Sequence, residues 1–359
     1  MREKFKDIKL DGTISITLDK ATNRVWTEHK AVVLKAIVDV CEEYQSQGYR
    51  LTLRQMYYQL VAKDLIPNHD KVYKKLSSLK DECVYSGLVD WSIFEDRGRV
   101  PKRAYFEENV VGALQRTVDF YKLDRQLDQP NHIEVWTEKD AISDILIRVT
   151  DPMTIHLVVN KGYSSSTAMY AAYQRFVERI QNGKNVVILY FGDHDPSGLD
   201  MVRDIEDRIM YFLRNGSAFN QDIIDEWVEY QDFYDLRDKY MHDHSYWVLH
   251  PDGETEQLDY TRIFFEERFT IKPIGLTMEQ IQEYKPPHNP AKITDPRAKD
   301  YVKQFGQKSW EVDALTPAIM TQIVSDAIDE ELDHEIYETT LKMERDDQDE
   351  IKEIIENLK

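Results

Sequence analysis

Three acidic side chains follow two apolar stretches of the sequence, at the points where those stretches end. Glu138 comes directly after HIEVWT, while Asp193 and Asp195 follow NVVILYFG in a D-x-D pattern. Open α/β sheets bind their ligands at the carboxyl ends of parallel strands. Two aspartates on one side of an extended segment repel each other unless a cation neutralises them. A single D-x-D is usually a solvated turn, but together with Glu138 the pattern predicts an all-oxygen site for Mg²⁺ or Mn²⁺.

A second feature with chemical potential lies between these stretches, in VVNKGYSSST. We expect a strand here to pass through Lys161 and Gly162 into a helix whose first turn is rich in Ser and Thr. Free backbone N–H groups, the positive end of a helix dipole and a lysine would then meet at one place, which suits a phosphate group. An ordinary helix cap without a ligand is the alternative.

Basic side chains are concentrated in the first third of the chain. The 359 residues carry a net charge of -20, yet residues 1–127 hold 22 Lys and Arg against 19 Asp and Glu. In the helix expected over residues 70–85, lysines recur on the face opposite the apolar stripe, and the loop EDRGRVPKR adds arginines. The candidate DNA contacts are Lys71, Lys74, Lys75, Arg97 and Arg99. A basic face that only meets solvent is an equally good interpretation at this stage.

The basic residues belong to a segment that reads as three helices followed by a hairpin. After a short alternating strand at residues 13–18, the apolar spacing predicts helices over residues 28–47, 52–63 and 70–85, and then a strand in GLVDWSIF. Three helices and a hairpin with a basic tip are typical of a winged helix-turn-helix. The lysine-bearing helix would face the DNA groove, and the arginine loop would form the wing.

Beyond a linking helix at residues 105–127, short apolar runs alternate with helices. HIEVWT, TIHLVV, NVVILYFG and YWVLH predict a parallel sheet in an α/β domain. The end of the chain is helical by spacing and strongly acidic, with 14 acids against 4 bases after residue 325. We therefore expect a DNA-binding domain over residues 1–127 with an N-terminal extension, an α/β domain over 128–314 and an acidic helical tail over 315–359.

Several classes of protein are excluded by composition and pattern. The most apolar stretch, at residues 31–40, is interrupted by Lys35 and Asp39, so we expect neither a signal peptide nor a membrane span, and a cytoplasmic protein. Cys41 and Cys83 form no C-x-x-C pair, which argues against a zinc site or a disulfide framework. No Walker A pattern for nucleotide binding is present.

Four motifs occur in an order that resembles the topoisomerase VI A subunit and the related meiotic double-strand-break transesterase. E-K-D-A at Glu138, K-G-Y at Lys161 and D-x-D-P-x-G at Asp193 resemble the Toprim domain of that family. T-x-R-x-x-Y-Y at residues 52–58 is similar to a motif on its winged-helix domain. FTIKPIGLTMEQIQEY and WEVDAL look like later segments, so the resemblance spans residues 28–320. It implies a winged helix followed by a Toprim domain, with a parallel sheet flanked by helices.

The resemblance implies Mg²⁺-dependent DNA cleavage by transesterification, in which a tyrosine attacks the phosphate. In the helix at residues 52–63, Tyr57 lies on the apolar stripe, whereas Arg54 and Tyr58 share the opposite face at i, i+4. Tyr58 is therefore the expected nucleophile, and Arg54 would hold the scissile phosphate. The other implied site residues are the metal ligands Glu138, Asp193 and Asp195, and Lys161 as an additional positive charge.

The family also implies partners. Its members cut double-stranded DNA as homodimers, in which the tyrosine of one protomer meets the metal site of another, and a separate ATPase subunit would be needed here. A hydrolytic Toprim nuclease, as in some phage or plasmid defence systems, is the main alternative, with water as the attacking group and Tyr58 only structural. A non-catalytic DNA-binding protein stabilised by a metal is a third reading, against which the intact carboxylate set argues.

Overall fold

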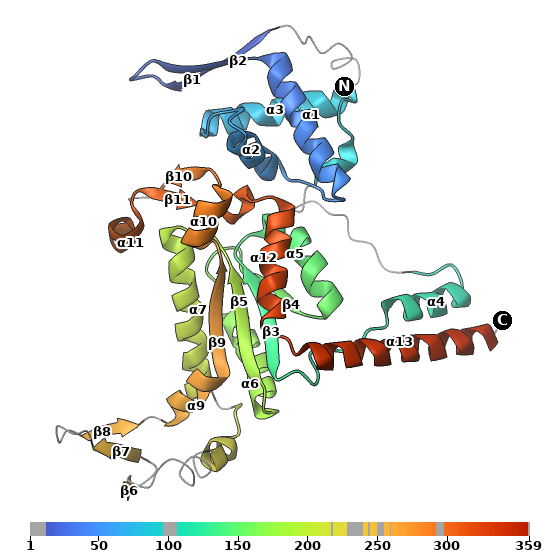
Figure 1. Ribbon diagram of the computed structural model, residues 1–359, viewed down its shortest axis with the longest axis vertical. Helices are drawn as coiled ribbons and strands as arrows, with labels where there is room; N and C mark the ends of the chain where they lie inside the picture. The colour runs from blue at the N-terminus through green and yellow to red at the C-terminus, as the bar shows by residue number, and fades with distance from the viewer. Residues whose placement is uncertain are drawn as a thin grey trace.

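A four-stranded parallel sheet lies at the centre of the chain, with helices on both faces (Figure 1). The computed structural model describes residues 12–95, 106–216, 218–227, 240–242, 245–249, 255–258, 260–291 and 298–357. The strand order is β4-β3-β5-β9. The strands are β3 (Asn131–Thr137), β4 (His156–Val159), β5 (Asn185–Phe191) and β9 (Phe269–Gly275). The protein is therefore α/β, and three of the expected strands form the sheet.

Each face of the sheet has its own hydrophobic core. Ile133 and Leu189 pack on the face covered by α5 and α12, whereas Trp136 and Ile188 pack on the face covered by α6, α7 and α9. Because both faces are buried, β5 reads as a continuous apolar run rather than as an alternating one, whereas β3 carries the buried Glu134 between Ile133 and Val135. The helices are α5 (Ser143–Thr150), α6 (Ser166–Gln181), α7 (Pro196–Asn215), α9 (Tyr260–Arg268) and α12 (Pro317–Asp329).

The N-terminal unit consists of an antiparallel hairpin and three helices. These elements are β1 (Thr13–Asp19), β2 (Arg24–His29), α1 (Lys30–Ser46), α2 (Leu53–Ala62) and α3 (Asp70–Ser86). The three predicted helices are present. The first begins later than expected, because residues 24–29 pair with β1. Thr52 caps α2 through a reciprocal pair of hydrogen bonds with Gln55, which fixes the start of the helix that carries Arg54 and Tyr58.

The strand predicted in GLVDWSIF is not formed. Trp91–Ile93 is a single 3₁₀ turn, and only one parallel bridge joins Phe94 to Leu51. The arginine loop, with Arg97 and Arg99, lies outside the described residues. The apolar residues that suggested a strand serve the helical core instead, since Val89 and Ile93 are buried against it.

The fourth strand of the parallel sheet is also different from the predicted one. The residues YWVL of the run YWVLH lie in β7 (Ser245–Leu249), which pairs antiparallel with β6 (Tyr240–His242) and β8 (Thr255–Leu258) in a separate sheet. The fourth position belongs to β9 at the sheet edge. Its sequence alternates exposed Thr270 and Lys272 with buried Ile271, so it lacks the uninterrupted apolar run that marks β5.

The segments after the sheet connect it to the N-terminal unit. They are α10 (Met278–Tyr284), β10 (His288–Pro290), α11 (Ala298–Phe305) and β11 (Lys308–Trp310). The antiparallel β10–β11 hairpin lies between α2 and the sheet (Figure 1). The buried Gln59 amide of α2 donates to the backbone oxygens of Ala314 and Leu315, at 3.3 and 3.4 Å. The hairpin and the turn after it therefore fix α2 above the sheet.

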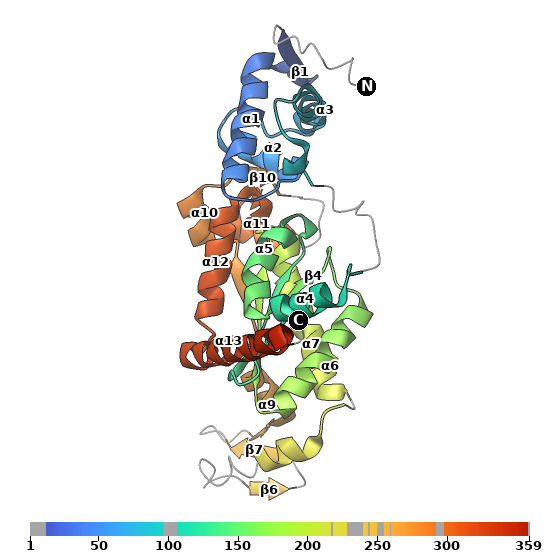
Figure 2. The ribbon, with the colours of Figure 1, turned by 90° about the vertical axis from the view of Figure 1, so that its right-hand side faces the viewer.

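Two further helices lie side by side in both views, α4 (Val110–Phe120) and α13 (His334–Asn357) (Figures 1 and 2). The linking helix is thus shorter than the predicted 105–127. The acidic end of the chain is helical, as expected, but α12 belongs to the α/β core, because Met320 and Val324 pack beneath the sheet. The described helices include none that is both long and apolar enough to cross a membrane.

One buried ion pair in the sheet makes a testable contribution to stability. Glu134 of β3 is fully buried and accepts hydrogen bonds from Arg175 Nε at 2.8 Å and Trp136 Nε1 at 2.9 Å. Burial by itself raises the pKa of Glu134, but its contacts with His132 and Arg175 outweigh burial and hold the pKa at about 2. The charged form is therefore the stable one in the folded protein.

We expect Glu134→Gln to lower the free energy of unfolding by about 3 kcal/mol at pH 7, since the pKa lies about 2.5 below its ordinary value. A lowered pKa stabilises the fold above about pH 4.5, and this contribution is lost as the pH falls toward 2. Urea unfolding at pH 7, 5 and 3 should show the difference from wild type shrinking with acidity. Glu178→Gln, on the exposed face of α6, removes the same charge and should change little. A pH-independent difference would contradict this account.

Candidate active site

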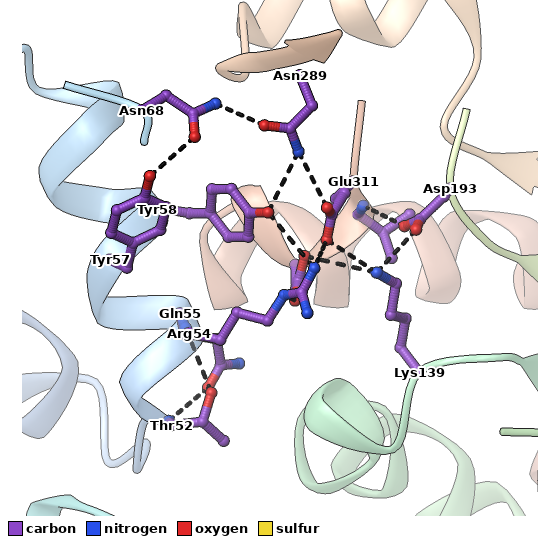
Figure 3. A network of polar contacts seen from close by, with 12 residues as sticks. Thr52, Arg54, Gln55, Tyr57, Tyr58, Asn68, Lys139, Asp193, Asn289 and Glu311 are labelled. Carbon is purple, nitrogen blue, oxygen red and sulfur yellow. Dashed lines mark hydrogen bonds and ion pairs between the residues drawn. The ribbon is translucent and has the colours of Figure 1, made fainter. Parts of the chain in front are cut away.

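A cleft of about 830 Å³ lies between α2 and the carboxyl end of the parallel sheet. Five of the predicted site residues line it: Arg54, Tyr58, Glu138, Asp193 and Asp195. They come from segments far apart in the sequence, yet their side chains meet in one place within a single chain. Figure 3 shows those of α2 facing Lys139 and Asp193 across the cleft.

Tyr58 and Arg54 form the N-terminal wall of the cleft. Arg54 Nη2 lies 3.5 Å from Tyr58 Oη, as expected for positions i and i+4 of one helix. Asn289 Nδ2 donates to Tyr58 Oη at 3.3 Å and to Glu311 Oε1 at 3.0 Å, so it holds these two groups side by side. The Tyr58 side chain is buried with only 5% of its surface exposed. It is therefore a packed residue whose hydroxyl alone reaches the cleft.

The strand ends form the opposite wall. Glu138 and Lys139 follow β3, and Asp193 follows β5, where its Oδ1 accepts the Val312 N–H at 2.9 Å. Asp195 caps α7 by accepting the Gly198 N–H at 2.6 Å. A side chain at Gly198 would meet the Asp193 carbonyl oxygen at 2.2 Å, so the tight turn from strand to helix needs glycine there. This turn brings the D-x-D pair to the cleft.

Two cations and two further carboxylates complete the cleft. Lys139 Nζ lies 2.7 Å from Asp193 Oδ2 and 3.0 Å from Glu311 Oε2. Arg54 pairs with Glu311 and, through Nε at 3.2 Å, with Asp313. The Asp313 carboxylate is fully buried, and neither of its oxygens accepts a hydrogen bond of good geometry. Each cation is thus shared between acids, and the acids outnumber the cations.

Burial, together with the excess of acids, shifts the pKa values in the cleft. Burial, followed by the charge of Asp193, raises the pKa of Glu138 to about 8, and burial raises that of Asp193 as well. Burial also raises the pKa of Asp313 to about 7. The pKa of Glu311 is about 2, because Lys139 and Arg54 together outweigh its burial. Burial and the charge of Glu311 raise the pKa of Tyr58 above its ordinary value, so its phenol is protonated at neutral pH.

The carboxylate set fits a hard divalent cation in donor type and charge. Glu138, Asp193 and Asp195 offer only oxygen ligands, which Mg²⁺ and Mn²⁺ prefer. Burial raises the pKa values of Glu138 and Asp193, and the charge of Lys139 offsets only part of this rise. Their ligand atoms do not all lie within 4.8 Å of one another in this structure. A bound ion would therefore draw the three carboxylates closer together.

A different group of metal-ligand side chains lies on the sheet itself. His132, Glu134 and His156 place one ligand atom each within 4.8 Å of one another, the single such group among the described residues. Two imidazoles and one carboxylate would suit zinc better than magnesium. An ion there would compete with Arg175, which already holds both oxygens of Glu134. We interpret the group as part of the buried ion pair described above.

The remaining predicted residues that the structure describes lie outside the cleft. Lys161 is exposed and pairs with Asp140 at 3.4 Å, beyond the cleft walls. Lys74 and Lys75 are exposed on α3, as the lysine face predicts. Lys71 instead donates to the backbone oxygens of Thr17, at 2.6 Å, and Leu18. The structure thus ties one of the three lysines to the β1–β2 hairpin.

Lys139, Asn289 and Glu311 line the cleft and Asp313 pairs with Arg54, and none of these four was predicted as a site residue. One signal was present in the sequence, since Glu311 and Asp313 repeat the spacing of Asp193 and Asp195 directly after β11. Lys139 lies directly after Glu138, so the same strand end marks both residues. Nothing in the local sequence marks Asn289, whose place depends on the β10–β11 hairpin.

Comparison of the chain with protein-family models, with curated proteins and with solved structures found no match.

Proposed function

We propose that this protein cleaves double-stranded DNA with a divalent metal ion, through a covalent ester at Tyr58. One observation carries the proposal: the Tyr58 hydroxyl, Arg54 and the carboxylates of Glu138, Asp193 and Asp195 share one cleft. These are the groups that the resemblance to the topoisomerase VI A family assigns to the reaction. On this proposal the N-terminal unit acts as a winged-helix domain, and the α/β unit is a Toprim domain.

In the proposed reaction, Tyr58 Oη forms a bond to a backbone phosphorus, and the bond from phosphorus to the 3′ oxygen breaks. Arg54 leaves Glu311 to hold the phosphate, whose oxygens its planar guanidinium matches. Glu311 hydrogen-bonds the phenol; its pKa rises once Arg54 has left, so it takes the phenolic proton, and the 3′ oxygen acquires a proton as it leaves. When held by the three carboxylates, Mg²⁺ or Mn²⁺ supplies Lewis acidity toward the phosphate and the departing oxygen.

The proposal includes a homodimer and double-strand breaks made at two symmetry-related sites. It also includes a separate ATPase subunit if the cut is part of strand passage. Because Tyr58 and the carboxylates already share a cleft within one chain, a single protomer holds every group that the chemistry uses. Sedimentation analysis with and without DNA would test the dimer.

Hydrolysis is the second candidate, and the surroundings of Tyr58 favour it. The Tyr58 hydroxyl is hydrogen-bonded, its ring is buried and its pKa is raised, all of which weaken it as a nucleophile. Water would then attack the phosphate, and Tyr58 would be structural.

One experiment separates the two reactions. End-labelled DNA is incubated with the protein and Mg²⁺ or Mn²⁺, and the reaction is stopped with denaturant. Label that migrates with the protein supports the tyrosyl ester, whereas cut DNA free of protein supports hydrolysis. Absence of any cutting, with DNA binding intact, would contradict both.

A further inference from the structure

A groove of about 450 Å³ continues from the cleft along the β10–β11 hairpin. Asn68, His69 and Pro290 line both the cleft and the groove, so the two are contiguous. The other lining residues come from the β1–β2 hairpin, the segment before α3 and the β10–β11 hairpin: Leu18, Arg24, Pro67, His288, Gln307 and Lys308.

The groove differs in charge from the rest of the protein. The described residues that line it include no carboxylate, although the whole chain has a net charge of -20. Arg24 and Lys308 are permanent cations on its rim, both exposed, and within the described residues neither has an acidic partner within 4 Å. Asp19, which faces Arg24 across the strand ladder, is held by the Ala21 N–H and the Thr22 hydroxyl, each at 2.8 Å.

Polar groups on the groove wall are fixed and directed. His69 Nδ1 accepts the Lys71 N–H at 3.1 Å, so the neutral ring carries its proton on Nε2, which can donate. Asn68 Nδ2 donates to Asn289 Oδ1 at 2.6 Å and to the His288 carbonyl at 3.0 Å. These bonds join the groove wall to the residue that holds Tyr58, so groove and cleft form one rigid surface.

We propose that this groove binds the phosphate backbone of the DNA that flanks the cleavage point, with Arg24 and Lys308 as the phosphate contacts. The inference rests on the proposed function, because it takes the strand in the cleft to be DNA. Cations without acidic partners favour a polyanion, since each phosphate that they neutralise releases a condensed counterion. The ammonium group of Lys71, by contrast, donates to a backbone oxygen of the β1–β2 hairpin. The DNA path thus runs along the two hairpins.

The test is DNA binding by the full chain without divalent ions, so that no cutting occurs. A fluorescent duplex is titrated with wild type, with Arg24→Ala/Lys308→Ala, and with Lys342→Ala/Arg345→Ala. The last pair, exposed on α13, removes the same two charges far from the groove. We expect the groove variant to bind the duplex at least about tenfold more weakly than wild type. The slope of the logarithm of its binding constant against the logarithm of salt concentration should fall in magnitude by about 2.

Each outcome bears on the inference. A groove variant that binds like the α13 variant, with an unchanged salt slope, overturns it. Equal thermal midpoints for all three proteins establish that the loss is not one of folding. The proposed function fails independently of this inference if wild type binds DNA through the groove but neither cuts the DNA nor forms a covalent adduct with it. A wild type that binds no duplex at low salt overturns both.

Discussion

Tyr58→Phe should abolish the protein–DNA adduct, with a loss of about 10³-fold or more in its rate of formation, because the phenylalanine has no oxygen to attack phosphorus. The fold should survive the change. The Tyr58 hydroxyl lies 3.3 Å from Asn289 Nδ2 and 3.5 Å from Arg54 Nη2 and hydrogen-bonds Glu311, so loss of these contacts should lower the free energy of unfolding by about 1 kcal/mol. The measurement is transfer of end label to protein under denaturing conditions.

Tyr57→Phe is the matched control. Tyr57 precedes Tyr58 on the same helix and also lines the cleft, but its hydroxyl donates to Asn68 Oδ1 at 2.8 Å and accepts the His69 N–H. It lies away from the Arg54 guanidinium, and its variant should keep the adduct. If Tyr58→Phe still releases cut DNA at the wild-type rate, hydrolysis is the reaction and the nucleophile assignment is wrong.

Asp193→Asn should reduce metal-dependent cutting at least about 100-fold, through either reaction, because it removes the central carboxylate of the proposed metal site. The change also removes the charged carboxylate oxygen that lies 2.7 Å from Lys139 Nζ. The Lys139 ammonium group then keeps Glu311 as its acidic partner. The variant should therefore remain folded, and its defect should lie in binding the ion.

The matching measurement is thermal unfolding with increasing Mn²⁺. Wild type should gain about 2.7 kcal/mol when the ion is present at one hundred times its Kd, and Asp193→Asn should lose most of this gain. Asp119→Asn, on the exposed face of α4, removes an equal charge and should behave like wild type. An unchanged response of Asp193→Asn to Mn²⁺ would exclude the carboxylate cluster as the ion site.

The elements with strong local signals were predictable. The apolar stripes of α1, α2 and α3 predicted three helices, and the apolar residues of β3 and β5 predicted the centre of the sheet, where both strands are buried on both faces. β9 escaped prediction because an edge strand keeps exposed residues such as Lys272. YWVLH shows the reverse error, since an apolar run does not specify which sheet it joins.

The site was predictable in its parts but not as a network. Each carboxylate was marked by the strand before it, and Arg54 with Tyr58 by helical spacing. Their partners were not, because Glu311 and Asn289 reach the cleft through contacts between residues more than 200 positions apart. The raised pKa of Glu138 likewise depends on burial that no local pattern reports.

The dependence of α2 on a late segment also matters during synthesis. Gln59 is buried against Ala314 and Leu315, the former 255 positions further along the chain. At 5–20 residues per second, translation needs roughly 10 to 50 seconds to cover that stretch. Until then the N-terminal unit has an amide without partners, and Tyr58 has no Glu311 beside it. A nascent or truncated chain that ends before residue 311 therefore carries the tyrosine without its cleft, and the complete cleft arises only after residue 315 has been made.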